Sequence, residues 1–192
     1  MINNYLLYLA YLTQKLEKFF DNQAPYIFCK KGCSKCCENG EYPFSKLEFD
    51  FINIGFSKLS DEKRKIVEEN IRRIKKEKAE FNGETFSYAC PFLINNECSV
   101  YEFRGIICRS FGLMSINDKG ASKIPFCAFE GLNYSNVLEP ETKIISSEKY
   151  KKLGNVNEPL AFNVSYKFLT SDEMAKNFSI NFGDKKSLID WF

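Results

Sequence analysis

Eight cysteines are the residues of this sequence whose types and spacing could do chemistry, and they fall into two groups. Thiolates two or three residues apart can converge on one ion, because a tight turn brings both sulfurs to one side. Repeated spacings of this kind in a chain without histidine predict a metal centre held by sulfur. The predicted ligands are Cys29, Cys33, Cys36 and Cys37 in the first group, and Cys90, Cys98, Cys108 and Cys127 in the second.

The adjacent pair Cys36 and Cys37 constrains how the ligands divide. Neighbouring side chains point about 100° apart on a helix and to opposite faces of a strand. We therefore expect the two sulfurs to diverge, so that one completes the first group and the other extends toward the second. Eight ligands divided in this way suit either two four-thiolate sites or one multinuclear centre.

Soft thiolate ligands select zinc or iron, the latter including an iron–sulfur cluster, over magnesium, calcium or manganese. The sequence does not choose between zinc and iron–sulfur. A divalent ion with four thiolates carries a net charge of about −2 and needs cations or N–H donors nearby. Arg104 and Arg109 bracket Cys108 and are the predicted supporting cations. Glu102, which either arginine could hold, is a further candidate supporting residue.

The composition excludes several other classes of protein. The chain has 192 residues with 27 basic and 25 acidic side chains, a balance that gives no strong nucleic-acid footprint. No segment is long and apolar enough to span a bilayer, and the first residues do not resemble a secretory signal. We therefore predict a cytoplasmic protein with reduced thiols, a metal ion as its partner and no membrane association. The sequence identifies no protein partner.

Hydrophobic periodicity predicts a mainly α-helical fold with a small β-hairpin. Helices are expected over 4–20 and 61–80, and a further one after the capping-box sequence Ser45-Lys-Leu-Glu48. The remaining predicted elements are a hairpin turning at Asn95-Asn96, a short helix over 102–111, a strand within 161–170, and short helices opening at Ser171 and Asp184.

The cysteines also predict how the chain is organised. Residues 1–130 are expected to form a compact cysteine-cluster domain, with its motif core over 29–127. No cysteine follows Cys127, so residues 131–192 are expected to be a C-terminal extension packed on that domain.

The sequence resembles the YkgJ-type cysteine-cluster family, whose domain is described as chelating zinc or iron. The resemblance covers residues 29–127 and depends on the cysteine spacing together with the surrounding residues. It departs from the family pattern at Gly105, where the family usually has proline. The resemblance implies metal chelation by the eight cysteines. The matching segments are Cys29-x3-Cys33-x2-Cys36-Cys37, Cys90-Pro-Phe-Leu93, Cys98-Ser-Val-Tyr101-Glu102-x-Arg104, Cys108-Arg-Ser-Phe111 and Cys127.

Two other functions remain open alongside a metal-binding module, and no activity is assignable from the sequence. Cys29-x3-Cys33-x2-Cys36 has the spacing of radical S-adenosylmethionine enzymes. Cysteine clusters similar to this one are present in flagellin lysine methylases, which implies an iron–sulfur enzyme linked to S-adenosylmethionine as one alternative. The adjacent cysteines also allow a thiol-redox protein.

Overall fold

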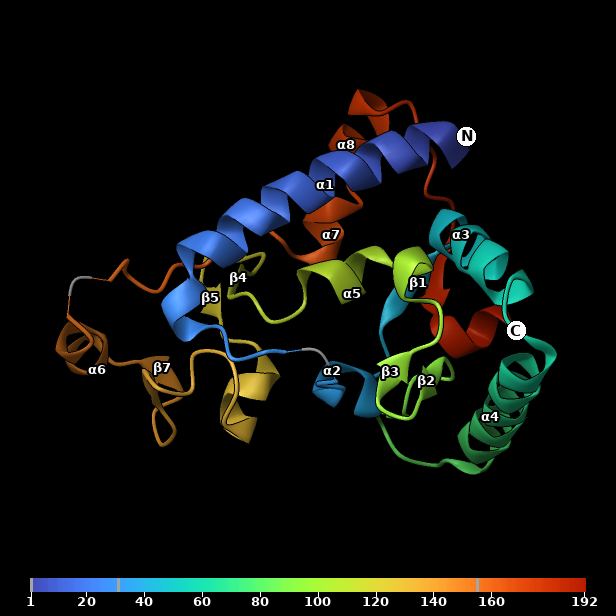
Figure 1. Cartoon of the computed structure of the whole chain (residues 1–192), viewed down its shortest axis with the longest axis horizontal. Coiled ribbons are helices and arrows are strands. Elements are labelled where there is room, and N and C mark those ends of the chain that lie inside the picture. Colours follow the sequence, from blue (N-terminus) through green and yellow to red (C-terminus); the bar gives the residue numbers. More distant parts are fainter. Residues whose placement is uncertain (1, 31, 155) are drawn as a thin grey trace. The chain divides into compact units, whose positions relative to one another are not determined.

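The structure is a computed structural model that describes residues 2–30, 32–154 and 156–192. Helices dominate it, and the described strands form small antiparallel sheets of two strands each (Figure 1). The predicted fold class, mainly α with a small hairpin, is therefore confirmed. The described part contains three hairpins rather than one, and a fourth strand pair joins segments far apart in the sequence.

The chain divides into two compact units. The first unit consists mainly of Gly32–Cys108 and Ser179–Phe192. Its elements are α2 (Lys35–Glu38), β1 (Pro43–Ser45), α3 (Lys46–Ser57), α4 (Asp61–Glu80), β2 (Leu93–Ile94), β3 (Glu97–Cys98), η2 (Tyr101–Phe103), the first part of α5 (Ile106–Ser110), β8 (Lys185–Ser187) and η4 (Leu188–Trp191).

The two long helices of the first unit begin where their sequences predict. The Ser45 side chain accepts a hydrogen bond from the Glu48 N–H, and the Glu48 carboxylate accepts one from the Ser45 N–H, so the predicted capping box opens α3. Ser60 caps α4, whose thin apolar line is its buried face. Acidic residues in the first turn of α4 complement the helix dipole.

The predicted hairpin joins β2 to β3, with Leu93 opposite Cys98. Asn95 and Asn96 both have positive φ, of 51° and 62°. Two such residues in a two-residue loop match the twist of the flanking strands, and asparagine tolerates that conformation well. The turn residues therefore determine the register that places Cys98.

A hydrophobic core runs through the first unit and includes the C-terminal residues. β8 pairs antiparallel with β1, and Trp191 donates from Nε1 to the Phe44 carbonyl at 2.9 Å. Cys90, Cys98 and Cys108 pack against this core. The buried core residues are Phe44, Ile52, Val67, Ile71, Ile74, Tyr88, Phe92, Val100, Leu188 and Ile189.

The second unit consists of Asn3–Lys31 and Arg109–Phe178. Its helix α1 (Ile2–Asn22) confirms the first predicted helix, although Leu6 is exposed and Tyr5 takes its place on the buried face. The other elements are η1 (Ala24–Tyr26), β4 (Ser115–Ile116), β5 (Ser122–Lys123), η3 (Phe126–Glu130), β6 (Leu138–Glu139), β7 (Ile144–Ile145), α6 (Ser147–Lys152), α7 (Tyr166–Leu169) and α8 (Asp172–Asn177).

Two predicted elements are wrong. In the segment 161–170, predicted as a strand, Tyr166–Leu169 forms helix α7, because Ser165 caps a helical turn by accepting from the Phe168 N–H. Phe162 makes a single parallel bridge to Ser115 and does not continue into a strand. A helix was predicted to open at Asp184, but the chain there forms strand β8, since its backbone pairs with β1. The helix predicted at Ser171 is confirmed as α8.

The predicted boundary between a domain over 1–130 and an extension over 131–192 stays a prediction. In the described structure the last residues of that extension, from Ser179 onward, belong to the first unit. No helix in the described ranges has both the length and the apolar character needed to cross a membrane.

Candidate metal centre

Helix α2 carries the adjacent cysteines on a single turn. The Cys37 N–H donates to the Ser34 carbonyl at 2.7 Å, which closes the turn. The two thiol sulfurs lie 3.8 Å apart and share a hydrogen bond in which either can be the donor. The prediction that these sulfurs diverge is therefore wrong, because each cysteine has a choice of χ1 rotamers and the backbone direction alone does not place its sulfur.

The hairpin supplies two further thiols, each held in the same way. The Cys90 sulfur accepts a backbone N–H from Phe92, and the Cys98 sulfur accepts one from Val100. Phe92 and Val100 are core residues, so the donors are fixed by packing. The Cys90 N–H in turn donates to the Cys37 carbonyl at 2.7 Å, which joins the hairpin to α2.

The third segment is α5, which carries Cys108 and begins at Ile106. The Ile106 N–H donates to Oε1 of Glu48 at 2.8 Å, while Oε2 of the same carboxylate accepts from the Ser45 backbone and hydroxyl at 2.9 and 2.7 Å. Glu48 is fully buried. One side chain therefore connects the start of α3 to the start of the helix that holds Cys108.

Gly105, the departure from the family pattern, lies at this contact. A Cβ atom there would come within 2.5 Å of the Phe44 ring and 3.0 Å of the Glu48 carboxylate. The absence of a side chain lets the backbone approach both groups closely.

The thiols of these three segments influence one another electrostatically. Burial is the largest cause of the raised pKa at Cys90, Cys98 and Cys108, and it brings the pKa of Cys90 to about 12. The hydrogen bond from Cys37 lowers the pKa of Cys36 to about 7, and the same bond raises the pKa of Cys37. Buried thiolates repel each other, so a proton is held more tightly on each neighbour.

Each of four of these thiols influences the pKa of the other three. In each of the six pairs among Cys36, Cys90, Cys98 and Cys108, the charge of one thiolate affects the pKa of the other thiol. Cys37 interacts in the same way with Cys36, Cys90 and Cys108. The fold therefore brings five of the eight predicted ligands within electrostatic range in the first unit.

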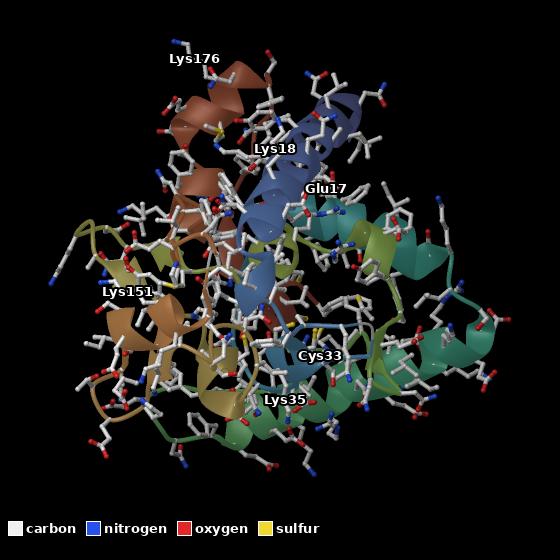
Figure 2. All side chains as sticks on the ribbon, turned by 60° about the vertical axis from the view of Figure 1, so that its left-hand side comes forward. Glu17, Lys18, Cys33, Lys35, Lys151 and Lys176 are labelled. Carbon is white, nitrogen blue, oxygen red and sulfur yellow. The ribbon has the colours of Figure 1, made fainter. Side chains whose placement is uncertain are left out.

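The other three predicted ligands are placed differently. Cys33 precedes α2 by two residues and is half-buried (Figure 2). Cys29 and Cys127 belong to the second unit, where Cys29 is exposed and Cys127 is buried. Among the described residues, no three Cys, Asp or Glu side chains are arranged to enclose an ion.

A buried amide fixes the backbone at Cys29. Oδ1 of Asn133 accepts from the N–H groups of Phe28 and Cys29, both at 2.8 Å, and Nδ2 donates to the Gly112 carbonyl at 3.0 Å. Asn133 has no exposed surface and follows Cys127 by six residues. Within the second unit it therefore links the segment of Cys29 to the segment that follows Cys127.

Of the predicted supporting residues, Arg104 is placed most clearly. Its guanidinium lies 3.7 Å from the centre of the Tyr101 ring, and Nη1 donates to the Tyr101 carbonyl at 2.8 Å. Arg104 lowers the pKa of Cys98, although burial of that thiol outweighs it. The supporting roles of Glu102 and Arg109 stay predictions.

Glu48 and Asn133 position cysteine segments but are not among the site residues predicted from the sequence. Glu48 was recognised only as a local cap. The available signal was its place in an otherwise apolar stretch of α3, which predicts a buried carboxylate with more than one partner. Asn133 gave no sequence signal, because an isolated asparagine is common in loops.

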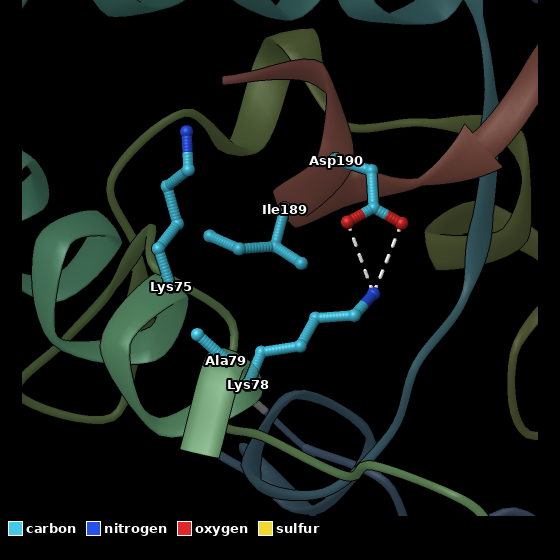
Figure 3. A pocket seen from close by; sticks show the side chains of 5 residues that line it. All are labelled: Lys75, Lys78, Ala79, Ile189 and Asp190. Atoms are coloured by element: carbon cyan, nitrogen blue, oxygen red, sulfur yellow. Dashed lines mark hydrogen bonds and ion pairs between the residues drawn. The ribbon is translucent and has the colours of Figure 1, made fainter. Parts of the chain in front are cut away.

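A shallow pocket in the first unit contains no thiol. It is lined by Lys75, Lys78 and Ala79 of α4 and by Ile189 and Asp190 of η4 (Figure 3). Lys78 contacts both carboxylate oxygens of Asp190 at 3.0 Å and also pairs with Glu41. This arrangement joins the C-terminal residues to α4.

The first unit supplies thiols from a one-turn helix, a hairpin and a second short helix, and backbone N–H groups donate to two of the sulfurs. Such an arrangement is typical of cysteine-rich metal-chelating domains. Residues 28–128 match the model of the CxxCxxCC family, described as a putative zinc- or iron-chelating domain. The match covers more than half of the chain, and the chain belongs to this family. Neither the curated proteins nor the solved structures compared with the sequence give a match.

The family name also shows where this chain is unusual. Its spacing CxxCxxCC matches Cys33-x2-Cys36-Cys37. The first gap, from Cys29 to Cys33, is one residue longer here. The three cysteines that keep the spacing belong to the first unit, whereas Cys29 belongs to the second.

Proposed function

We propose that the first unit is a thiolate metal-binding module that holds zinc or iron, the iron as a single ion or in an iron–sulfur cluster. The proposed primary ligands are Cys36, Cys90, Cys98 and Cys108. The observation that carries this proposal is the packing of Cys90, Cys98 and Cys108 against one core, together with the bond from the Cys90 N–H to the Cys37 carbonyl at 2.7 Å, which brings the helix turn of Cys36 to the same place. Cys29, Cys33, Cys37 and Cys127 stay in the proposed ligand set on the strength of the sequence pattern.

The donor set suits a soft cation. Cys90 and Cys98 each accept a backbone N–H, which favours the thiolate form that binds metal. Arg104 supplies positive charge near Cys98. A divalent ion bound by four thiolates is a dianion, which is costly in a protein interior without such support.

Binding requires the thiols to turn toward a common point, since no three of them enclose an ion in the described structure. A change of χ1 rotamer moves a sulfur while the backbone stays in place. The backbone is already fixed by the bond from Cys90 to Cys37 and by Glu48 at α5. The apparent binding free energy of structural zinc in peptides is about 10–16 kcal/mol, which exceeds the cost of such rotations.

The test is metal analysis of the full chain purified without oxygen, combined with its absorption spectrum. We expect at least one zinc or iron per chain, colourless for zinc and brown for iron–sulfur. The double variant C90S/C98S should lose the metal. The matched double variant C29S/C127S removes the same number of thiols from the second unit and should retain metal in the first.

Two results would contradict the proposal. One is a wild-type chain that takes up neither zinc nor iron after reconstitution under reducing conditions. The other is a C90S/C98S variant that binds as much metal as wild type with the same affinity.

A further inference from the structure

Besides Cys33, the first unit contains five thiols, whereas a tetrahedral ion takes four. They are those of Cys36, Cys37, Cys90, Cys98 and Cys108. The fifth thiol is not remote, because Cys36 and Cys37 are neighbours in sequence and in space. We propose that Cys36 and Cys37 share one ligand position and that the pair hands a bound soft cation on to an external thiol. This inference rests on the proposed metal-binding function and concerns how the ion enters and leaves.

The separation of the two sulfurs supports a shared position. Metal–sulfur bonds of about 2.3 Å in a tetrahedron place neighbouring sulfurs about 3.8 Å apart. Cys36 and Cys37 have this separation before any ion is bound. An ion bound by one of these two sulfurs would therefore lie within reach of the other.

The backbone keeps this pair beside the other ligands during an exchange. Hydrogen bonds from the N–H groups of Cys37 and Glu38 to the Ser34 carbonyl hold the turn of α2. The Cys90 N–H bonds to the Cys37 carbonyl at 2.7 Å, so the pair cannot move away from the hairpin without breaking that bond. Only the side chains of Cys36 and Cys37 have to rearrange.

The exchange balances without any added reactant. Either sulfur can donate the hydrogen bond between the two cysteines, so the one that is not bound to the ion would keep its proton beside the other. If that cysteine replaced its neighbour as the ligand, its proton would pass to the leaving sulfur, and one metal–sulfur bond would form as the other broke. Charge, the number of protons and oxidation states would be unchanged.

This device addresses the main obstacle to releasing an ion from four thiolates. Full dissociation of a tightly bound ion is slow, but replacing one ligand at a time never exposes a bare ion. Cys36 and Cys37 are both only half-buried, so an external thiolate can take the position that one of them leaves. The class of partner is therefore a thiol-bearing acceptor of zinc or another soft cation.

The test compares the zinc-loaded full chain with variants C36S, C37S and C36S/C37S. Each single variant should retain one zinc with an affinity within about tenfold of wild type, below the 10–100-fold cost typical of losing even a supporting contact. The double variant should lose more than about 100-fold. Transfer of zinc to a competing dithiol chelator should slow by at least about tenfold in either single variant.

Two matched controls accompany these variants. C98S removes a thiol that has no neighbouring substitute and should lose more than about 100-fold in affinity as a single change. Lys35→Ala changes the exposed residue next to Cys36 on the same turn and should alter neither affinity nor transfer rate (Figure 2). Alanine versions of both single variants repeat the comparison, so that a folding defect in one serine variant does not decide the result.

The outcomes separate this inference from the proposed function. If C36S or C37S alone loses as much affinity as the double variant, the remaining cysteine does not take over the position, and the shared position is refuted. If both single variants transfer zinc at the wild-type rate, the hand-over role is refuted while metal binding stands. A wild-type chain that binds no zinc and no iron contradicts the proposed function itself.

Discussion

Replacement of Glu48 by alanine tests whether one buried carboxylate holds the cysteine helix in place. The change removes the acceptor for the N–H groups of Ser45 and Ile106, at 2.9 and 2.8 Å, in a site with no solvent exposure. A buried donor left without its partner costs about 1–3 kcal/mol. The two donors together predict a loss of about 2–6 kcal/mol, which is large against a typical domain stability of about 5–15 kcal/mol.

The assay is urea unfolding followed by the fluorescence of Trp191, the only tryptophan of the chain. Trp191 belongs to the first unit and bonds to the Phe44 carbonyl, so its signal reports on that unit. Glu48→Gln keeps one carbonyl acceptor, which can serve only one of the two donors, and should lose about half as much. Glu69→Ala changes the same residue type on the exposed face of α4 and should stay within about 0.5 kcal/mol of wild type.

Metal affinity should fall along with stability in Glu48→Ala, because the start of α5 is no longer fixed next to Cys108. A free energy of unfolding of Glu48→Ala within about 1 kcal/mol of the wild-type value would refute this role of Glu48. Two buried donors left without a partner cannot together cost so little.

Three further predictions follow from the same structure. Gly105→Ala should destabilise the first unit by about 1–3 kcal/mol in the same urea assay, because the new Cβ would lie 2.5 Å from the Phe44 ring. Asn133→Ala should lower the stability of the second unit by about 2–4 kcal/mol, which would be measured as faster hydrogen exchange at the Cys29 amide. An exchange rate equal to that of wild type would contradict the role of Asn133 in fixing the backbone at Cys29. The pKa of about 12 at Cys90 lies above that of an unfolded thiol, so its contribution to metal-free stability is complete below about pH 9 and lost between about pH 9 and 12. Urea unfolding at both ends of that window should show the loss, and Cys90→Ala should reduce it.

Much of the helical structure follows from local signals in the sequence. The capping box at Ser45 and Glu48 opens α3, and the apolar spacing and acidic first turn of α4 define a helix that ends where it was predicted to end. The asparagines at 95 and 96 specify the hairpin turn. Each of these features depends on residues within one or two turns of each other, and for that reason sequence patterns capture them.

The errors lie where distant backbone pairs compete with local propensity. The segment after Asp184 has the residues of a helix start, but strand β1 offers its hydrogen-bonding edge from about 140 residues earlier in the chain. The opposite error occurs near 161–170, where a serine cap closes a helical turn in a segment rich in strand-forming residues. Neither competition is visible from the local pattern alone.

The sequence by itself determined the chemistry of this protein: eight thiols and no histidine leave sulfur as the means of holding a soft cation. Only the tertiary structure decided which thiols share a unit, because the positions of the segments that carry Cys36, Cys90 and Cys108 depend on hydrogen bonds between parts far apart in the chain. It also reversed the expectation for Cys36 and Cys37, since side-chain rotation, which spacing does not encode, placed their sulfurs in contact.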